Sequence, residues 1–337
     1  MTNNETPILE IVDAHKYYDL KTLTAFGRVR EKVKAVRGVS LKLVQGEALG
    51  LVGESGCGKS TLARLIVKLE TPHQGTVFFR GQDVFKMSPK ETKETHRRIQ
   101  LIFQNPFSSL SPAMTIGEHV ADALTIHNIV RGKAAIEERA KQLLDTVGIG
   151  REVYGNYPSL SSAGDLQLAN IARALATNPD ILISDEGISV LDASEQAKIL
   201  NLLKDLQDEL KLTYIIITHD LSVVRHICDR LVVMYLGKVM EIGDNASVFS
   251  APINPYTKAL IESVPSVAKG LRDIRMTAMK GEVPSPIHLP PGCTFAPRCD
   301  LATDACRQTE PELIEVMPGR STACHHWEQV TRMHATS

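Results

Sequence analysis

The sequence has neither an excess of one charge nor an apolar stretch long enough to cross a membrane. It carries 38 basic and 39 acidic side chains among 337 residues, so composition lends no electrostatic support to nucleic-acid binding. Apolar runs such as 214–217 and 231–236 are far shorter than the roughly 20 residues that a membrane helix needs. A membrane role would therefore depend on partner proteins, and we expect no nucleic-acid partner.

The chain also lacks an apolar N-terminal segment and has few cysteines. Residues 1–10 are polar and acidic, without the apolar core of a secretory signal, so we expect a protein that is not exported. Of its 6 cysteines, Cys57 and Cys228 lie in the first two thirds of the chain. The others crowd the C-terminal tail: Cys293, Cys299, Cys306 and Cys324. Without export, these predict a metal or cluster site rather than disulfides.

What is present is an ordinary globular composition organised around one glycine-rich stretch. The hydrophobic fraction of 43% and the charged fraction of 23% fit one large or two modest domains with a buried core. Residues 53–61 read Gly-Glu-Ser-Gly-Cys-Gly-Lys-Ser-Thr, after the apolar run 49–52 and before the helical pattern 62–67. A preceding strand and a following helix are the context that a phosphate-binding loop requires, which disfavours a chance match in a glycine-rich turn.

The loop predicts a nucleotide site with its magnesium ion. Glycines let consecutive backbone N–H groups turn toward an anion, and the N-terminal end of the following helix favours negative charge. Lys59 is expected to reach the β- and γ-phosphates, and Ser60 to ligate Mg²⁺. The residues of the loop predicted to bind ATP are Gly53, Ser55, Gly56, Cys57, Gly58, Lys59, Ser60 and Thr61.

Polar side chains follow three predicted strands, at 99–103, 180–186 and 213–218. Gln104 could hold Mg²⁺ or the attacking water. Two carboxylates end the second strand, and they suit Mg²⁺ coordination through water by Asp185 and polarisation of the attacking water by Glu186. His219 ends the third strand and would contact the γ-phosphate, because ligands collect at the carboxyl ends of parallel strands. The alternatives are an acidic helix cap and a structural histidine.

The N-terminal part predicts strands at 9–12 and 36–44 by apolar alternation. The polar, basic segment 21–34 between them is predicted to be a loop or a hairpin extension. Tyr17 and Tyr18 are expected just after the first strand. Tyr18 could stack on a purine ring or be an ordinary residue at a strand end, and the sequence leaves both open.

Periodicity predicts the remaining elements. Residues 75–83 indicate a strand, a turn and a second strand, and residues 200–210 an amphipathic helix. Residues 105–176 indicate a helical insertion, with helices at 116–124 and 134–147.

In order and spacing, these elements resemble the ATP-binding subunits of ABC transporters over residues 8–245. The resemblance is carried by the phosphate loop, Q-loop, acidic strand, D-loop and H-loop: residues 53–61, Gln104, 181–186, 189–192 and 218–220. Further cues resemble the dipeptide and oligopeptide importer branch, most closely its F-type subunit: residues 103–106, 233–237 and 254–257. The resemblance implies an α/β fold with a P-loop NTPase core. It divides the chain into an ATPase domain (1–245) and a C-terminal extension (246–337).

The tail is similar to the C-terminal extension of this branch, in residues 290–295, 298–299, 311–313 and 323–325. Some members carry a 4Fe-4S cluster on four such cysteines. The resemblance therefore implies a cluster held by Cys293, Cys299, Cys306 and Cys324. Thiolates suit zinc as well as iron–sulfur clusters, and free thiols are a third possibility.

The chain departs from the family at its signature motif, Leu-Ser-Gly-Gly-Gln. Here the aligned segment 161–168 keeps Ser162 and Gly164, which the resemblance assigns to the γ-phosphate bound on the opposite subunit. The other positions hold Ala163 and Asp165, and Gly187 replaces the usual proline after the catalytic glutamate. At about 8 Å and an effective dielectric of about 20, the carboxylate would repel each phosphate charge by about 2 kcal/mol. The Ala163 Cβ would obstruct close approach if that position needed a positive φ.

The resemblance implies a peripheral ATPase at the cytoplasmic face of the cell membrane, powering peptide import. Its expected partners are a second, unlike ATPase, two transmembrane permease subunits, contacted near 105–116, and an extracytoplasmic substrate-binding protein. The altered signature predicts that one of the two composite ATP sites is degenerate. Alternatives are a regulatory subunit with little hydrolysis, and an importer of nickel or glutathione. A nucleic-acid-acting ABC protein is disfavoured, because such proteins usually carry two cassettes in one chain.

Overall fold

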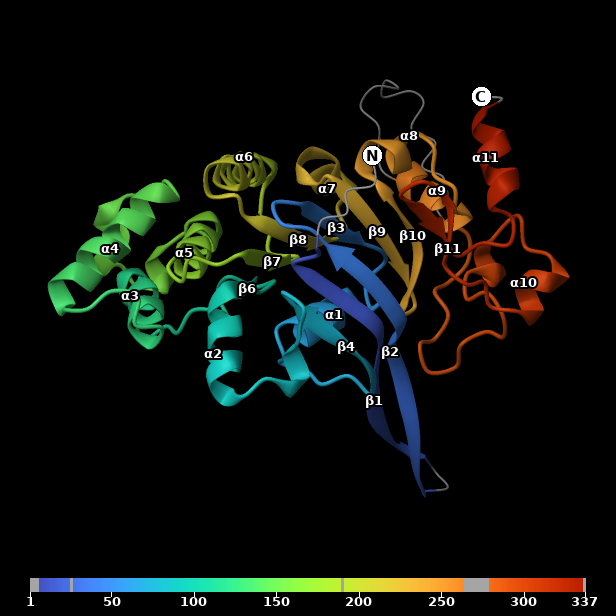
Figure 1. Cartoon of the computed structure of the whole chain (residues 1–337), viewed down its shortest axis with the longest axis horizontal. Helices are drawn as coiled ribbons and strands as arrows, with labels where there is room; N and C mark the ends of the chain where they lie inside the picture. The colour runs from blue at the N-terminus through green and yellow to red at the C-terminus, as the bar shows by residue number, and fades with distance from the viewer. Residues whose placement is uncertain (1–5, 25–26, 189–190, 264–278, 336–337) are drawn as a thin grey trace.

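The computed structural model describes residues 6–24, 27–188, 191–263 and 279–335 (Figure 1). Its centre is an eight-stranded sheet in the order β11-β12-β10-β9-β3-β8-β7-β6. The parallel strands are β3 (Ala48–Val52), β6 (Ile99–Ile102), β7 (Ile181–Asp185), β8 (Thr213–Thr218) and β9 (Arg230–Tyr235). The antiparallel strands are β10 (Lys238–Asp244), β11 (Ile314–Met317) and β12 (Arg320–Thr322). The tail of the chain thus extends the sheet that carries the phosphate loop.

A second sheet is antiparallel, in the order β2-β1-β4-β5. Its strands are β1 (Leu9–Thr24), β2 (Gly27–Leu43), β4 (Gln74–Phe79) and β5 (Gln82–Asp83). The segment predicted as a loop or hairpin extension is a hairpin, whose ladder runs past Asp19, paired with Lys32, to the ends of both strands. Tyr17 and Tyr18 therefore lie inside β1, and the prediction that they follow the first strand is wrong. The opposite charges of Asp19 and Lys32 support strand pairing beyond the apolar pattern.

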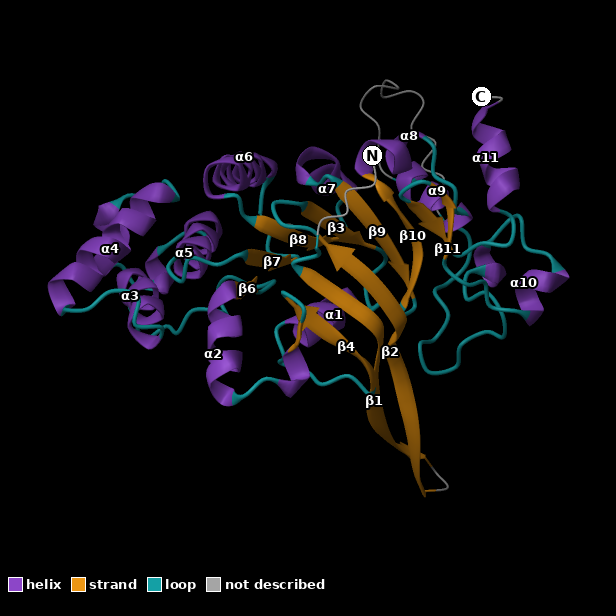
Figure 2. Ribbon diagram, in the orientation of Figure 1, coloured by secondary structure: helices purple, strands orange, loops and turns teal. Residues whose placement is uncertain are grey.

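Side chains of the central strands alternate between two cores, as the pleat of a strand requires. In β8, Tyr214 and Ile216 face one core, while Ile215 and Ile217 face the other. The second core contains the apolar side chains of α1 (Lys59–Ile66) and the antiparallel sheet. The first contains those of α6 (Ala193–Leu210) and α7 (Leu221–Ile227), which cover the opposite face of the sheet (Figure 2). The predicted α/β fold class is confirmed.

Three helices form a group at one end of the molecule: α3 (Ile116–Ile126), α4 (Lys133–Thr146) and α5 (Ala163–Leu175) (Figure 1). They confirm the two helices predicted in this insertion. The helix predicted at 200–210 begins earlier, because the Asp192 side chain accepts hydrogen bonds from the backbone N–H groups of Ser194 and Glu195, both at 2.9 Å.

The remaining helices are short and lie between strands or in the tail. They are α2 (Pro89–Arg98), α8 (Asn245–Ser250), α9 (Pro255–Glu262), α10 (Asp304–Gln308) and α11 (Trp327–Ala335), with 3₁₀ turns at Val84–Lys86, Arg151–Gly155, Pro158–Leu160 and Ala296–Arg298. None of the helices among the described residues combines the length and apolar character that a membrane span requires.

Candidate active site

The phosphate loop connects β3 to α1 and approaches neighbouring backbone too closely for side chains at two positions. Gly53 has a φ of +150°, and a Cβ there would lie 2.1 Å from the carbonyl oxygen of Met234. Gly58 has a φ of +106°, and its Cβ would lie 2.1 Å from the carbonyl oxygen of Ala35. Both positions therefore require glycine if the loop is to keep this path.

The Lys59 ammonium is held inside the loop. Its Nζ donates to the carbonyl oxygens of Gly53 (2.8 Å) and Glu54 (3.2 Å) and lies 3.9 Å from Glu186 Oε1. Only 4% of the side chain is exposed, so the cation is held at one place inside the loop. Phosphate oxygens arriving at the loop would meet a positioned positive charge.

The other loop residues differ in exposure. Ser55 and Gly56 are exposed at its surface, where backbone N–H groups can meet an anion, and Thr61 is half-buried. Cys57 is buried, with its Sγ 3.7 Å from Lys59 Nζ, and burial raises the pKa of this thiol. Its side chain thus packs inside the protein, away from the open side of the loop.

Ser60 and Asp185, the two residues expected to hold Mg²⁺, lie within hydrogen-bond distance of each other. Ser60 Oγ donates to Asp185 Oδ1 at 2.8 Å, joining α1 to the end of β7. Burial raises the pKa of Asp185, the Ser60 hydrogen bond opposes this, and the neighbouring Glu186 carboxylate adds to it. Hydroxyl and carboxylate oxygens are the donors that Mg²⁺ takes in proteins, so these two residues fit the ion.

Three polar side chains from the ends of adjacent strands converge beside this pair. Gln104 Nε2 donates to Glu186 Oε2 at 2.7 Å, and His219 Nδ1 lies 3.4 Å from Glu186 Oε1. Glu186 follows β7 with a φ of +53°, a conformation that turns the chain sharply at the strand end. His219 is largely exposed and Glu186 half-buried, so a water molecule can reach the carboxylate. This arrangement suits polarisation of a nucleophilic water.

The altered signature segment begins α5. Ser162 caps this helix by accepting a hydrogen bond from the backbone N–H of Asp165 at 3.1 Å. Ala163 is the first helical residue and has a negative φ, so the obstruction expected for a positive φ does not arise. Gly164 is buried, and a Cβ there would lie 2.5 Å from Glu195 Oε1. The structure thus adds a second carboxylate near this helix start, and sequence reasoning missed it because Glu195 belongs to another helix.

Figure 1 places α5 with the helical group, well separated from α1. Within one chain, the signature helix α5 therefore lies apart from α1, which begins at Lys59. The D-loop prediction falls partly on residues 189–190, which lie outside the described residues. Gly187, at the position of the usual proline, packs beside the buried Gln167, whose Nε2 would be 2.5 Å from an added Cβ.

Tyr18, the candidate for purine stacking, lies in β1 with the Lys16 Nζ 5.4 Å from its ring centroid. Lys16 also pairs with Glu70 at 2.7 Å. The Tyr18 ring is half-buried beneath this cation, and the stacking role stays a prediction.

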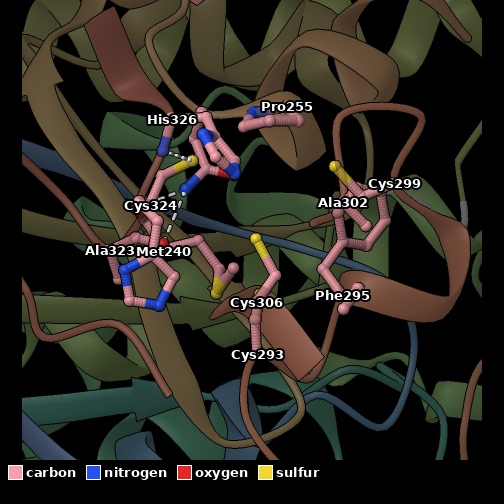
Figure 3. Close-up of a pocket in the computed structure, with 13 residues that line it drawn as sticks. Met240, Pro255, Cys293, Phe295, Cys299, Ala302, Cys306, Ala323, Cys324 and His326 are labelled. Carbon is pink, nitrogen blue, oxygen red and sulfur yellow. Dashed lines mark hydrogen bonds between the residues drawn. The ribbon is translucent and has the colours of Figure 1, made fainter. Parts of the chain in front are cut away.

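The four tail cysteines line one small cavity: Cys293, Cys299, Cys306 and Cys324 (Figure 3). Its volume is about 20 Å³, room for about one water molecule. Burial raises the pKa of Cys299 to about 11 and that of Cys324 to about 12. In the part of the chain that the structure describes, no three ligating side chains converge closely enough to hold a metal ion.

The site combines a phosphate loop between β3 and α1 with acidic, amide and imidazole groups at the ends of β7, β6 and β8. This combination defines a P-loop nucleoside triphosphatase of the ATP-binding cassette kind. Residues 36–189 match the profile of the family described as ABC transporter. Residues 240–306 match the family described as oligopeptide/dipeptide transporter, C-terminal region.

Similar proteins extend the comparison to almost the whole chain. The oligopeptide transport ATP-binding protein AppF of Bacillus subtilis is 43% identical over 96% of this chain and 98% of its own length. The dipeptide transport ATP-binding protein DppF of Haemophilus influenzae is 43% identical over 97% and 99%, respectively. The ATP-binding cassette MJ0796, solved as a dimer bound to ADP and Pi, matches with a TM-score of 0.63 and 27% identity over 70% of this chain and 98% of that one. The chain belongs to the ABC transporter family, in the branch of oligopeptide and dipeptide transport ATP-binding proteins, and is an ABC-type ATPase.

Proposed function

We propose that this chain hydrolyses ATP to power the import of peptides through an ABC transporter. The observation that carries the proposal is the convergence of Gln104, His219 and Lys59 on Glu186, in a chain 43% identical to peptide-transport ATP-binding proteins. A regulatory subunit without hydrolysis would have no need to keep a partly exposed carboxylate in this setting.

Each group has a role in this proposal. Lys59 and the loop N–H groups hold the phosphates, and Ser60 and Asp185 would hold Mg²⁺, which neutralises phosphate charge when bound. Glu186 accepts a hydrogen bond from the attacking water, while Gln104 and His219 fix the orientation of its carboxylate. His219, which is largely exposed, would also contact the γ-phosphate.

The working unit would be a dimer of unlike ATPases, since the signature helix lies away from the phosphate loop of its own chain. The dimeric form of the solved cassette MJ0796 supports pairing. Here the phosphate loop site is complete and needs an intact signature from its partner. The partner's phosphate loop would face α5, where Asp165 and Glu195 oppose a γ-phosphate, so that site would hold ATP and hydrolyse it slowly.

The remaining partners follow from the same assignment. Two permease subunits would carry the peptide across the membrane, with this chain at the cytoplasmic face and a substrate-binding protein on the other side. Residues 105–116 are the proposed permease contact, and the exposed Phe107 (54%) offers an apolar anchor there.

The test is uptake by the complete transporter reconstituted in proteoliposomes with its binding protein. We expect ATP-driven accumulation of a labelled dipeptide or oligopeptide, lost in Lys59→Ala. Accumulation of nickel or glutathione instead would keep the ATPase assignment and overturn the substrate. Failure to co-purify with detergent-solubilised permeases would overturn the transport role.

A metal or cluster on the four tail cysteines is a second part of the proposal. Soft thiol donors gathered around one cavity fit an iron–sulfur cluster or zinc, although the thiols must move closer to ligate it. A bound group would cross-link the segments that carry Cys293 and Cys324. Iron and zinc contents of anaerobically purified protein test this, comparing Cys306→Ala with the control Cys228→Ala, a cysteine outside the cavity. Equal metal content in both variants would rule out this site.

A further inference from the structure

The C-terminal extension reaches the phosphate loop through one buried arginine. Arg298 Nη1 donates to Glu54 Oε2 at 2.6 Å, and Nη2 donates to Glu54 Oε1 at 3.0 Å. This two-pronged contact joins residues that lie 244 positions apart in sequence. Only 4% of the arginine side chain and 22% of the glutamate side chain are exposed, so solvent screens the pair weakly.

Groups other than Glu54 also hold the Arg298 guanidinium. Its Nε donates to the carbonyl oxygen of Lys280 at 3.1 Å, and Nη1 also donates to the hydroxyl of Tyr235 at 3.2 Å. It lies 5.8 Å from the ring centroids of both Tyr235 and Phe295. A planar guanidinium held in this way presents its fork in one orientation, which lysine could not reproduce.

Glu54 in turn contacts Lys59 through its main chain. Its carbonyl oxygen accepts hydrogen bonds from Lys59 Nζ and from the backbone N–H of Cys57, both at 3.2 Å. Its own backbone N–H donates to the hydroxyl of Tyr256 at 3.0 Å. Arg298 on the side chain and Tyr256 on the main chain thus fix one loop residue, and that residue supports the Lys59 ammonium.

The same contacts explain the Asn-Pro-Tyr-Thr stretch at 254–257, which the nucleotide chemistry alone leaves unused. Asn254 caps α9 and accepts a hydrogen bond from the backbone N–H of Tyr256 at 3.0 Å. The Tyr256 ring packs against Tyr235 and Phe295, at centroid distances of 4.6 and 5.2 Å. An aromatic cluster with rings from β9, α9 and the tail therefore supports the loop through the Tyr256 hydroxyl.

A second contact from the tail reaches the loop at Cys57, through Glu310 and Arg37. Glu310 accepts from Arg37 Nη2 at 2.6 Å and pairs with Lys238 Nζ at 2.9 Å. The Arg37 backbone N–H donates to the carbonyl oxygen of Gly237, and the Gly237 N–H donates to that of Cys57, both at 2.9 Å. The tail thus holds both Glu54 and the turn against which Cys57 rests.

We propose that Arg298 is a positioning residue for ATP binding, which acts through Glu54 to hold the phosphate loop and Lys59 in place. The C-terminal extension is then a structural part of the nucleotide site rather than an independent appendage. The inference rests on the proposed function only in requiring that this loop bind ATP, and not on peptide import or on a metal at the cysteines.

MgATP binding to the purified full-length chain tests this in a double-mutant cycle. We expect Arg298→Ala to weaken MgATP binding about tenfold, in the range of coupling between linked sites. Glu54→Gln should have a similar effect, because it loses the charge and one of the two acceptor oxygens. The double variant should be no worse than the worse single one, since all three variants break the same two-pronged ion pair. Arg298→Lys should lie between wild type and Arg298→Ala, because it keeps the charge and loses the fork.

The matched control is Arg307→Ala, which removes an arginine of the same segment whose exposed pair with Asp304 involves neither Arg298 nor Glu54. It should leave MgATP binding unchanged. In the assembled transporter, Arg298→Ala should raise the KM for ATP while kcat at saturating ATP stays within about twofold. Should Arg298→Ala fail to fold, Glu54→Gln and Arg298→Lys complete the test.

Two results would overturn the proposal: unchanged MgATP binding in folded Arg298 variants, or additive effects of the Arg298 and Glu54 changes. If the wild-type transporter took up no peptide while the Arg298 and Glu54 variants still weakened MgATP binding as expected, the import role alone would fail and this proposal would stand.

Discussion

The two parts of the chain proposed to touch ATP differ in how they are built. Around the phosphate loop, Lys59, Ser60 and Glu186 are already held by hydrogen bonds and ion contacts from several elements. At the start of α5, the capped helix end carries Asp165 and has Glu195 nearby, two carboxylates where an anion is expected. In the proposed dimer, the chain would contribute a complete half-site and an altered one, so its output would depend on what its partner supplies.

The largest effect is expected within the phosphate loop itself. Gly53→Ala would force a Cβ to 2.1 Å from the Met234 carbonyl oxygen, so the loop must move. We expect MgATP binding to weaken by about 100-fold or more, since every 1.4 kcal/mol is tenfold. The matched control is Gly56→Ala, at a φ of +77° with open space around it. This change should weaken MgATP binding by only about 1 kcal/mol. Equal losses would show that close approach does not decide the loop's path.

The next largest effect is expected on the free energy of unfolding, when an ion pair between the tail and the central sheet is broken. Glu241 in β10 is fully buried and accepts from Arg320 Nη2 of β12 at 2.7 Å. Arg320→Met would leave a buried carboxylate without its cation, and we expect a loss of about 3 kcal/mol in the free energy of unfolding. Chemical denaturation measures it, with Arg332→Met, in the exposed terminal helix, as the control.

The pH dependence of this loss in the free energy of unfolding follows from the pKa of Glu241, which burial raises. Because the folded state then takes up a proton more readily than the unfolded state, stability rises as the pH falls through the folded pKa. Arg320 opposes this rise, so removing it raises the Glu241 pKa further, and the Arg320→Met variant should be less destabilised at pH 5 than at pH 7.5. A larger loss at pH 5 would contradict this account of the pair.

A smaller effect is expected at the signature helix. Asp165→Gln removes a carboxylate facing the partner's proposed ATP. We expect hydrolysis at that site to rise about tenfold, somewhat less than relief of a repulsion of about 2 kcal/mol would allow. The assay uses a transporter carrying Glu186→Gln, so that only the other site turns over. Asp208→Asn, an exposed change on α6, is the control. If Asp165→Gln has no effect in this background, the site is not limited by this charge.

The smallest effect is expected at Ala163. Its φ is negative and helical glycine is unfavourable, so Ala163→Gly should change hydrolysis less than about twofold in the same assay. A large rise would restore the steric explanation that the structure removes.

The sequence was sufficient for elements whose chemistry is local. The phosphate loop, the strands ending at Gln104, Glu186 and His219, and the α/β class follow from short motifs and apolar runs. The Arg298–Glu54 contact could not be predicted, because no local pattern relates residues 244 positions apart. The length of β1 was missed for a similar reason, since its outer part is held by pairing with β2 and not by an apolar pattern.

The most direct test of the difference between the two half-sites is ATPase activity of the assembled transporter with Glu186→Gln in this chain, against the matching change in its partner. We predict that Glu186→Gln lowers turnover by at least about 100-fold, while the partner's change leaves most of it. Full activity with Glu186→Gln would contradict the account, because the working site would then lie on the partner's phosphate loop, facing Asp165.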